Sequence, residues 1–211
     1  MRIVRKYTYN RRRLLVAAVA CGLVLLYLLF FFMSPSEVNL FSLVPFGDSP
    51  PPISITGTVK RTKASLVLDY QLQDHLGQVK WPSISLKPAR KDDLWKTTCL
   101  EFFLSKPNSK EYWEVNLSPT GDWNVYHFDD YRDGMKPEER VISMEIMVID
   151  KKLRVILHLT ELEIMAPSEP LELGITAVVE NVSDGSQTFW ALTHTGDQAD
   201  FHRRDSFILK V

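Results

Sequence analysis

The chain has few cysteines, and this scarcity excludes several kinds of protein. Its 211 residues include two cysteines, Cys21 and Cys99. Two cysteines cannot form a disulfide-dense scaffold or a four-cysteine zinc site. The rest of the composition, 45% hydrophobic and 24% charged, is typical of a globular protein and not of a disordered or fibrous one. The length allows one ordinary domain with an attachment.

Catalytic motifs are also missing. The sequence contains no GxSxG, no HExxH, no glycine-rich phosphate loop, and no kinase or dinucleotide-binding signature. Glu101 and Glu114 have the chemistry of a glycosidase acid pair. Most carboxylates that face each other on a sheet are, however, surface side chains without a catalytic role. We therefore predict that the protein is not an enzyme and has no catalytic residues.

Positive charge is concentrated at the N-terminus. Residues 1–13 hold six basic side chains and no acidic one, although the formal net charge of the whole chain is −1. The remainder of the chain is therefore acidic. An acidic body is a poor nucleic-acid binder, because phosphate contact needs a basic surface. We predict no nucleic-acid partner.

A long apolar run follows this basic tail. The 20 residues from Leu14 to Met33 include no charged side chain, and a helix of that length spans roughly 30 Å, the thickness of a bilayer core. Arg11–Arg13 precede the run and no positive residue follows it before Lys60, so the positive-inside rule places the N-terminus in the cytoplasm. A cleaved signal peptide would have a shorter apolar region that ends in small residues. The sequence thus predicts a single-pass protein of the inner membrane, with a cytoplasmic tail at 1–13, a transmembrane anchor at 14–33 and a periplasmic C-terminal domain.

Residues 34–52 are rich in proline. They contain five prolines, three of them in the run Pro50–Pro52, and such runs favour an extended polyproline conformation. We predict a linker over 34–52 that holds the domain away from the membrane. The apolar side chains within 38–46 leave open whether part of this stretch packs on the domain or lies at the lipid surface.

The remaining residues, 53–211, alternate apolar and polar side chains with a period of two, which is typical of β-strands. Polar turns separate the segments, and no sustained helical stripe occurs. We therefore predict an all-β fold, an antiparallel β-sandwich of jelly-roll type, over 53–211. The expected strands are Ile53–Val59, Leu66–Leu72, Cys99–Ser105, Tyr112–Leu117, Trp123–Phe128, Ile142–Ile149, Leu153–Leu159, Leu171–Val179, Phe189–Leu192 and Phe207–Val211.

Two neighbouring strands predict a polar sheet face. In Cys99–Ser105 and Tyr112–Leu117 one alternating set is purely apolar and should face the core. The opposite set then presents Glu101, Glu114 and Asn116, together with the ring of Tyr112. The next strand offers either of its two faces to this surface. Rings that stack on apolar sugar faces, together with fixed carboxylates and amides that bond hydroxyl groups, suit a sugar or polyol. A solvated outer face with strand-favouring aromatics is the alternative.

A haem site is permitted by the residues but not required by them. It would need an axial pair drawn from the histidines and methionines, and the chain offers Met135, Met144, Met147 and Met165 with five histidines. No spacing among them predicts a metal site. We therefore predict no cofactor, with haem as the alternative.

Three segments carry a family resemblance. They are Leu94–Phe103, Tyr112–Phe128 continued by Tyr131–Met135, and Asp200–Phe207. Together they resemble the bacterial DOMON-like domains related to family nine carbohydrate-binding modules. The resemblance implies a β-sandwich that binds a ligand without catalysis, and sugar and haem binders both occur in the wider group. Its signature positions are Trp95, Glu101, Asn116, Trp123, Tyr126 and Arg132, with Asp200 and His202 in the last motif.

We predict a membrane-anchored, non-catalytic module that binds a carbohydrate or another cell-envelope ligand. The expected stacking residues are Trp95, Trp123, Tyr126 and Trp190, and the expected hydrogen-bonding residues are Glu101, Asn116 and Arg132. The alternatives are a haem-binding electron-transfer domain and a structural or protein-interaction domain of an envelope complex. The sequence names no protein partner.

Overall fold

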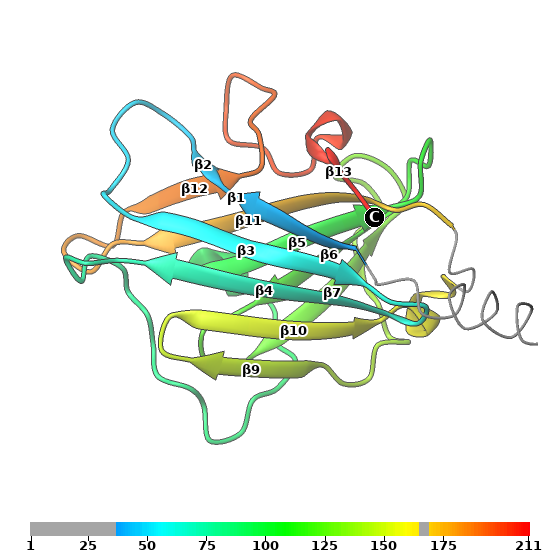
Figure 1. Cartoon of the computed structure of the whole chain (residues 1–211), viewed down its shortest axis with the longest axis horizontal. Coiled ribbons are helices and arrows are strands. Elements are labelled where there is room, and N and C mark those ends of the chain that lie inside the picture. Colours follow the sequence, from blue (N-terminus) through cyan, green and yellow to red (C-terminus); the bar gives the residue numbers. More distant parts are fainter. Residues whose placement is uncertain (1–36, 165–168) are drawn as a thin grey trace, which may run out of the picture. The chain divides into compact units, whose positions relative to one another are not determined.

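The computed structural model describes residues 37–164 and 169–211. These residues form two antiparallel sheets that lie one over the other (Figure 1). The first sheet has five strands, in the order β1 (Val38–Ser42), β3 (Ser54–Arg61), β4 (Ser65–Gln73), β10 (Lys152–His158) and β9 (Glu145–Ile149). Three short 3₁₀ helices, Leu94–Lys96, Leu159–Leu162 and Arg204–Ser206, are the helical turns of this part of the chain. The all-β sandwich is therefore confirmed for these residues.

The second sheet has eight strands and carries the surface of interest. Seven of them follow one another across the sheet in the order β2 (Val44–Pro45), β12 (Gln187–Ala191), β11 (Glu172–Glu180), β5 (Cys99–Ser105), β6 (Tyr112–Leu117), β7 (Trp123–Phe128) and β8 (Lys136–Pro137). The eighth, β13 (Leu209–Lys210), pairs with β11 beside this path.

The core lies between the two sheets. Leu100, Phe102 and Leu104 of β5 are fully buried there, as are Val115 and Leu117 of β6. They pack against alternate side chains of β3, β4 and β10 from the first sheet. Because successive strand residues point to opposite faces, burial of this set turns Glu101 and Phe103 to the outer side of the second sheet.

The sandwich begins earlier in the chain than the sequence predicts. Within the expected linker, Val38–Ser42 pairs with β3, and Val44–Pro45 pairs with β12. The physical reason is a fit between Phe41 and Gly57, which lie opposite each other across the two strands. A side chain at Gly57 would collide with the Phe41 ring, so the missing Cβ provides the space that buries it. The linker of 34–52 is thus corrected, because 38–45 belong to the domain.

The predicted membrane anchor at 14–33 and the basic tail at 1–13 lie outside the described residues. Within 37–164 and 169–211, no helix has the length and apolar character needed to span a bilayer.

Candidate functional site

Cross-strand register places polar and aromatic side chains in rows on the outer face of the second sheet. Asn116 of β6 lies between Glu101 of β5 and Asn124 of β7, and Thr176 of β11 continues the row beyond Glu101. In the next row Glu114 lies between Phe103 and Tyr126. Directly paired residues share a face, so the two carboxyls come to the same outer surface from neighbouring strands.

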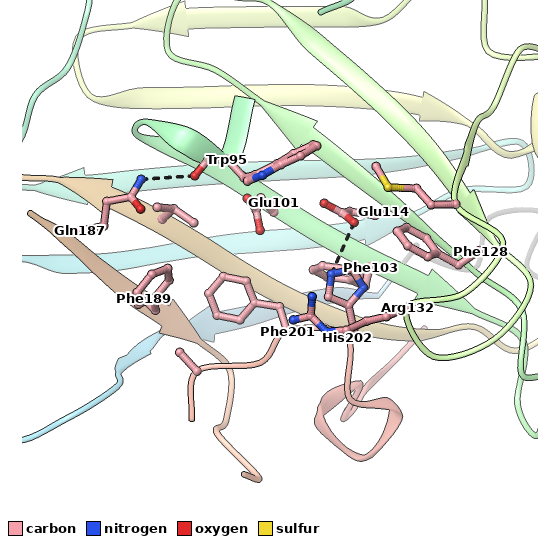
Figure 2. A pocket seen from close by; sticks show the side chains of 13 residues that line it. Trp95, Glu101, Phe103, Glu114, Phe128, Arg132, Gln187, Phe189, Phe201 and His202 are labelled. Atoms are coloured by element: carbon pink, nitrogen blue, oxygen red, sulfur yellow. Dashed lines mark hydrogen bonds and ion pairs between the residues drawn. The ribbon is translucent and has the colours of Figure 1, made fainter. Parts of the chain in front are cut away.

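This face is hollowed into a cavity of about 360 Å³. The volume lies toward the low end of small-ligand pockets, roughly 300–1,000 Å³. Figure 2 shows that its lining side chains come from the sheet and from the segments outside the strands that carry Trp95, Arg132 and Phe201. Its aromatic walls are Trp95, Phe103, Phe128, Phe189 and Phe201, and its polar lining is Glu101, Glu114, Arg132, Gln187 and His202.

The loops are tied to the sheet by specific contacts. Trp95 sits on the 3₁₀ turn Leu94–Lys96, and its ring meets Tyr126 edge to face at 5.7 Å between centroids. Its carbonyl accepts a hydrogen bond of 3.3 Å from Gln187 Nε2. On the other side Arg132 donates to Asp200 Oδ1 over 2.8 Å. These contacts fix the walls around the cavity.

Glu101 and Glu114 are almost completely buried at the floor of the cavity, with 2% and 5% of their surface exposed. Burial, and then the charge of Glu114, raises the pKa of Glu101 well above the ordinary carboxyl range. Burial likewise raises the pKa of Glu114, although Asn116 Nδ2 donates to its Oε1 over 2.8 Å. Because the charge of one carboxyl acts on the other, the two titrate as a pair, and the pair retains a proton near neutral pH.

His202 closes the floor as a neutral imidazole. Burial, and then the charge of Arg132, lowers the pKa of His202 to about 4. Its Nδ1 lies 2.8 Å from the Tyr112 hydroxyl, and its Nε2 lies 3.9 Å from Glu114 Oε2. The second distance is within the range of an ion pair, but a neutral ring adds no positive charge, so the contact does not neutralise Glu114.

Comparisons with known proteins show the fold. No protein-family model matches this chain. No curated protein matches it either. A solved structure from Bacteroides uniformis, a protein whose proposed role is carbohydrate binding, matches with a TM-score of 0.61 and 10% sequence identity. The match covers 83% of this chain and 85% of that one. At 10% sequence identity, this match shows that the two proteins share a fold.

The structure brings together five of the seven predicted site residues. Trp95, Glu101 and Arg132 line the cavity. Asn116 and Tyr126 lie on the same face but beneath its surface, where they are 0% and 3% exposed. Asn116 bonds Glu114, and the Tyr126 hydroxyl donates to Asp92 over 2.6 Å. These two residues position the floor and the wall.

The other two predicted residues, Trp123 and Trp190, face the core between the sheets. Trp123 pairs with Leu117 across β6 and β7, while Trp190 pairs with Ala177 across β11 and β12. Both partners belong to the core-facing set, and the pleat sends paired residues to the same side. This placement corrects the expectation that the two tryptophans stack on a ligand with the others.

The site also contains residues that the strand pattern and the resemblance do not predict as ligand contacts. Glu114 was visible in the alternation of β6, on the same face as Asn116. Phe189 neighbours Trp190 and therefore takes the outer face when Trp190 turns inward. Phe201 and His202 come from a loop whose position no strand pattern reveals. His202 was visible only as part of a motif.

Potential metal ligands cluster elsewhere. Among the described residues, one trio of histidine and acidic side chains, Glu111, His127 and Asp129, has its ligand atoms within 4.8 Å of one another. None of the three lines the cavity, and Lys136 Nζ already bonds Asp129 at 3.2 Å. Cys99 is a buried free thiol whose pKa is raised by burial, which makes it unreactive.

Proposed function

We propose that the chain is a non-catalytic binding module that holds a carbohydrate in the cavity on the outer face of the eight-stranded sheet. The observation that carries this proposal is the composition of the cavity, in which aromatic walls surround buried carboxyls. Aromatic rings cover the apolar faces of a sugar, and fixed oxygen acceptors orient its hydroxyl groups. The fold shared with the Bacteroides uniformis protein supports this class of ligand. A finer placement among the DOMON-like domains related to family nine carbohydrate-binding modules is part of the proposal.

The two acids support binding better than catalysis. A glycosidase needs its carboxyls on either side of the scissile bond, with room for the sugar between them. Glu101 and Glu114 instead project from adjacent strands into one floor, and each has almost no exposed surface. They are placed to contact one group of a ligand from the same side.

The proposal includes a membrane anchor at 14–33 with the domain outside the cytoplasm. We expect alkaline phosphatase fused after Val211 to be active in cells, because that enzyme forms its disulfides only in an oxidising compartment. The same fusion to a chain that starts at Glu37 should be inactive. Equal activity of the two fusions in whole cells would contradict the anchor.

Removing an aromatic wall should weaken sugar binding. We expect Trp95→Ala to bind its glycan about tenfold more weakly than the native chain, because it deletes one stacking surface. Trp95→Phe should recover part of the loss, since it keeps a ring. The measurement is a glycan array followed by calorimetry on the full-length chain, in a detergent whose head group is not a sugar.

The control is Leu86→Ala, which removes a fully exposed apolar side chain outside the cavity and should bind normally. Urea unfolding of each variant separates lost binding from lost folding. The proposal fails if no glycan binds, or if Trp95→Ala binds as well as the control. Silence on the array with a co-purifying protein would favour an interaction domain of an envelope complex.

Haem is the second candidate, and one observation favours it. Met135 and His202 both line the cavity, so the two residue types that form a haem axial pair occur at one site. The floor fits haem poorly, however, because two buried carboxyls would lie against an apolar macrocycle. A Soret band in the purified chain would identify haem, and not a sugar, as the ligand of the cavity.

A further inference from the structure

The floor of the cavity is acidic, and no lysine or arginine of the described residues forms a hydrogen bond with its two carboxyls. Glu101 and Glu114 contribute two carboxyls, while His202 is neutral. Arg132 lines the same cavity and its charge lowers the pKa of Glu114, but its guanidinium donates to Asp200 and not to either carboxyl. Buried carboxyls are normally paired with a cation or protonated. The site therefore holds acceptors that are short of a donor.

Glu101 shows this shortage at the level of one atom. Its Oε2 accepts a hydrogen bond of 3.2 Å from Thr176 Oγ1. Its Oε1 is buried, and no hydrogen bond of ordinary geometry reaches it from the described residues. The Cys99 thiol, a weak donor, is the other side chain that interacts with this carboxyl and lowers its pKa. A buried acceptor without a partner is costly. Figure 2 shows this carboxyl and that of Glu114 directed into the cavity, between Trp95 and the loop that carries Phe201 and His202.

We propose that the cavity recognises a primary ammonium group and that its carbohydrate ligand is an amino sugar with a free amine. The sugar part of this inference rests on the proposed function. An ammonium group supplies both missing elements, a positive charge for two carboxyls and N–H donors for the open oxygen. The aromatic walls attract the same cation through their ring faces.

A primary amine fits better than a quaternary one. A quaternary ammonium is attracted by aromatic rings but has no N–H to donate, so it would leave Glu101 Oε1 without a partner. An N-acetylated sugar keeps one N–H but carries no charge. A neutral hydroxyl donates one hydrogen bond and again leaves two carboxyls uncompensated. The floor should thus prefer a sugar with a primary ammonium group over one with an N-acetyl or a hydroxyl group at the same position.

Ammonium binding should displace a proton. The empty carboxyl pair retains one, and an ammonium ion favours the ionised form in its place. Affinity for an amine should therefore rise with pH from about 5 to 7, as the pair becomes easier to ionise. The titratable or charged groups that surround the pair are Tyr70, Cys99, Tyr112, Tyr126, Arg132 and His202.

None of these neighbours changes the sign of this effect. Burial raises the pKa of both Tyr70 and Cys99, so each stays neutral over that range. The pKa of Tyr112 is likewise raised, to about 12, mainly by burial. Burial, followed by the Arg132 charge, lowers the pKa of His202 to about 4, so the imidazole is neutral throughout. The carboxyl pair is therefore the group that titrates.

The test compares amines with their acetylated and neutral counterparts. Glucosamine, galactosamine and mannosamine are each matched with the N-acetyl sugar and with the parent hexose, and glucosamine is also tested as its β-1,4 trimer. Calorimetry uses the full-length chain at pH 5, 6 and 7, in buffers of different ionisation enthalpy. We expect at least one amine to bind about tenfold more tightly than both of its counterparts at pH 7, with release of a proton. Glu101→Gln should remove this preference, so that the amine binds no more tightly than its neutral counterparts.

The control variant is Glu145→Gln, which changes an exposed carboxyl on β9 of the other sheet. A sugar-free pair, cyclohexylammonium and cyclohexanol, separates the two proposals. If cyclohexylammonium binds and no sugar does, the ammonium site stands and the carbohydrate function fails. If hexoses or N-acetyl sugars bind as tightly as the amines, the carbohydrate function stands and the ammonium site is overturned. If no amine binds, or Glu101→Gln keeps the preference, the inference is overturned as well.

Discussion

We expect Glu101→Gln to make the protein more stable than the native chain at pH 8 and nearly equal to it at pH 5. The reason is the buried carboxyl pair. Burial, reinforced for Glu101 by the charge of Glu114, raises the pKa of both carboxyls in the folded chain. In the unfolded chain both return to the ordinary value of about 4.3. Glutamine has nearly the same shape and carries no charge to bury.

The direction of the effect follows from proton binding. Above about pH 4.3 the unfolded chain has released protons that the folded chain keeps, so rising pH favours unfolding. Each extra proton held by the folded state lowers the free energy of unfolding by about 1.4 kcal/mol per pH unit. Between pH 5 and 7 the native chain should lose about 3 kcal/mol if the pair keeps one proton. The loss ends once the folded-state carboxyl ionises.

Urea unfolding followed by tryptophan fluorescence between pH 4 and 9 measures this slope. Glu145→Gln, on an exposed part of β9, is the control and should keep the native slope. Parallel pH profiles for the native chain and Glu101→Gln would sink the idea that this carboxyl is protonated in the fold. A ligand with an ammonium group should itself flatten the native slope, which links the stability experiment to the binding experiment.

A different carboxyl sets the acid limit of the profile. Two hydrogen bonds from the Arg140 side chain, at 2.8 and 2.7 Å, lower the pKa of Glu138 to about 2, and Trp113 Nε1 donates a further one over 2.9 Å. A carboxyl whose pKa is lower in the folded chain than in the unfolded chain stabilises the fold at pH values above its unfolded-state pKa. That stabilisation is lost as the pH falls toward 2. Stability should thus be greatest near pH 5, between the range of Glu138 and that of the pair at the cavity floor.

Strand patterns predicted the bounds of three neighbouring strands beneath the site, β5, β6 and β7, but not the short strands β2 and β8 of the same sheet. β5, β6 and β7 begin and end where alternation places them, and in β5 and β6 one face is a continuous apolar set. The same alternation gave the common face of Glu101 and Asn116. It could not decide the face of β7, whose two sets both contain rings. That choice depends on the pairing of Trp123 with Leu117, which is a property of register and not of composition.

The walls of the cavity were harder to predict than its floor. Phe201 and His202 reach the cavity from a loop whose course depends on Asp200, which accepts from Arg132 and also from the backbone N–H of His202. Contacts between residues about seventy positions apart leave no periodic signal. Trp190 was misplaced for another reason: a short strand with two adjacent rings, Phe189 and Trp190, fits either orientation until its partner strand is known.

Phe41→Ala should destabilise the domain by about 3–5 kcal/mol, the usual loss when a buried phenylalanine is truncated. Phe41 is 7% exposed, lies over Gly57 and meets Tyr70 edge to face at 5.4 Å between centroids. The Tyr70 hydroxyl crosses the core and donates to the carbonyl of Glu101 over 2.7 Å, so the loss reaches the strand beneath the cavity. Urea unfolding of the full-length chain measures it.

The matched control is Leu40→Ala in the same strand. Leu40 is 80% exposed, and its truncation should change the free energy of unfolding by at most about 0.5 kcal/mol. In a linker the two substitutions would have equal and small effects, because neither side chain would be buried. A large difference between neighbours therefore tests whether the sandwich begins at Val38. Equal effects would mean that residues 34–52 act as a spacer. They would also mean that Phe41 does not support Tyr70, whose hydroxyl bonds the strand beneath the cavity.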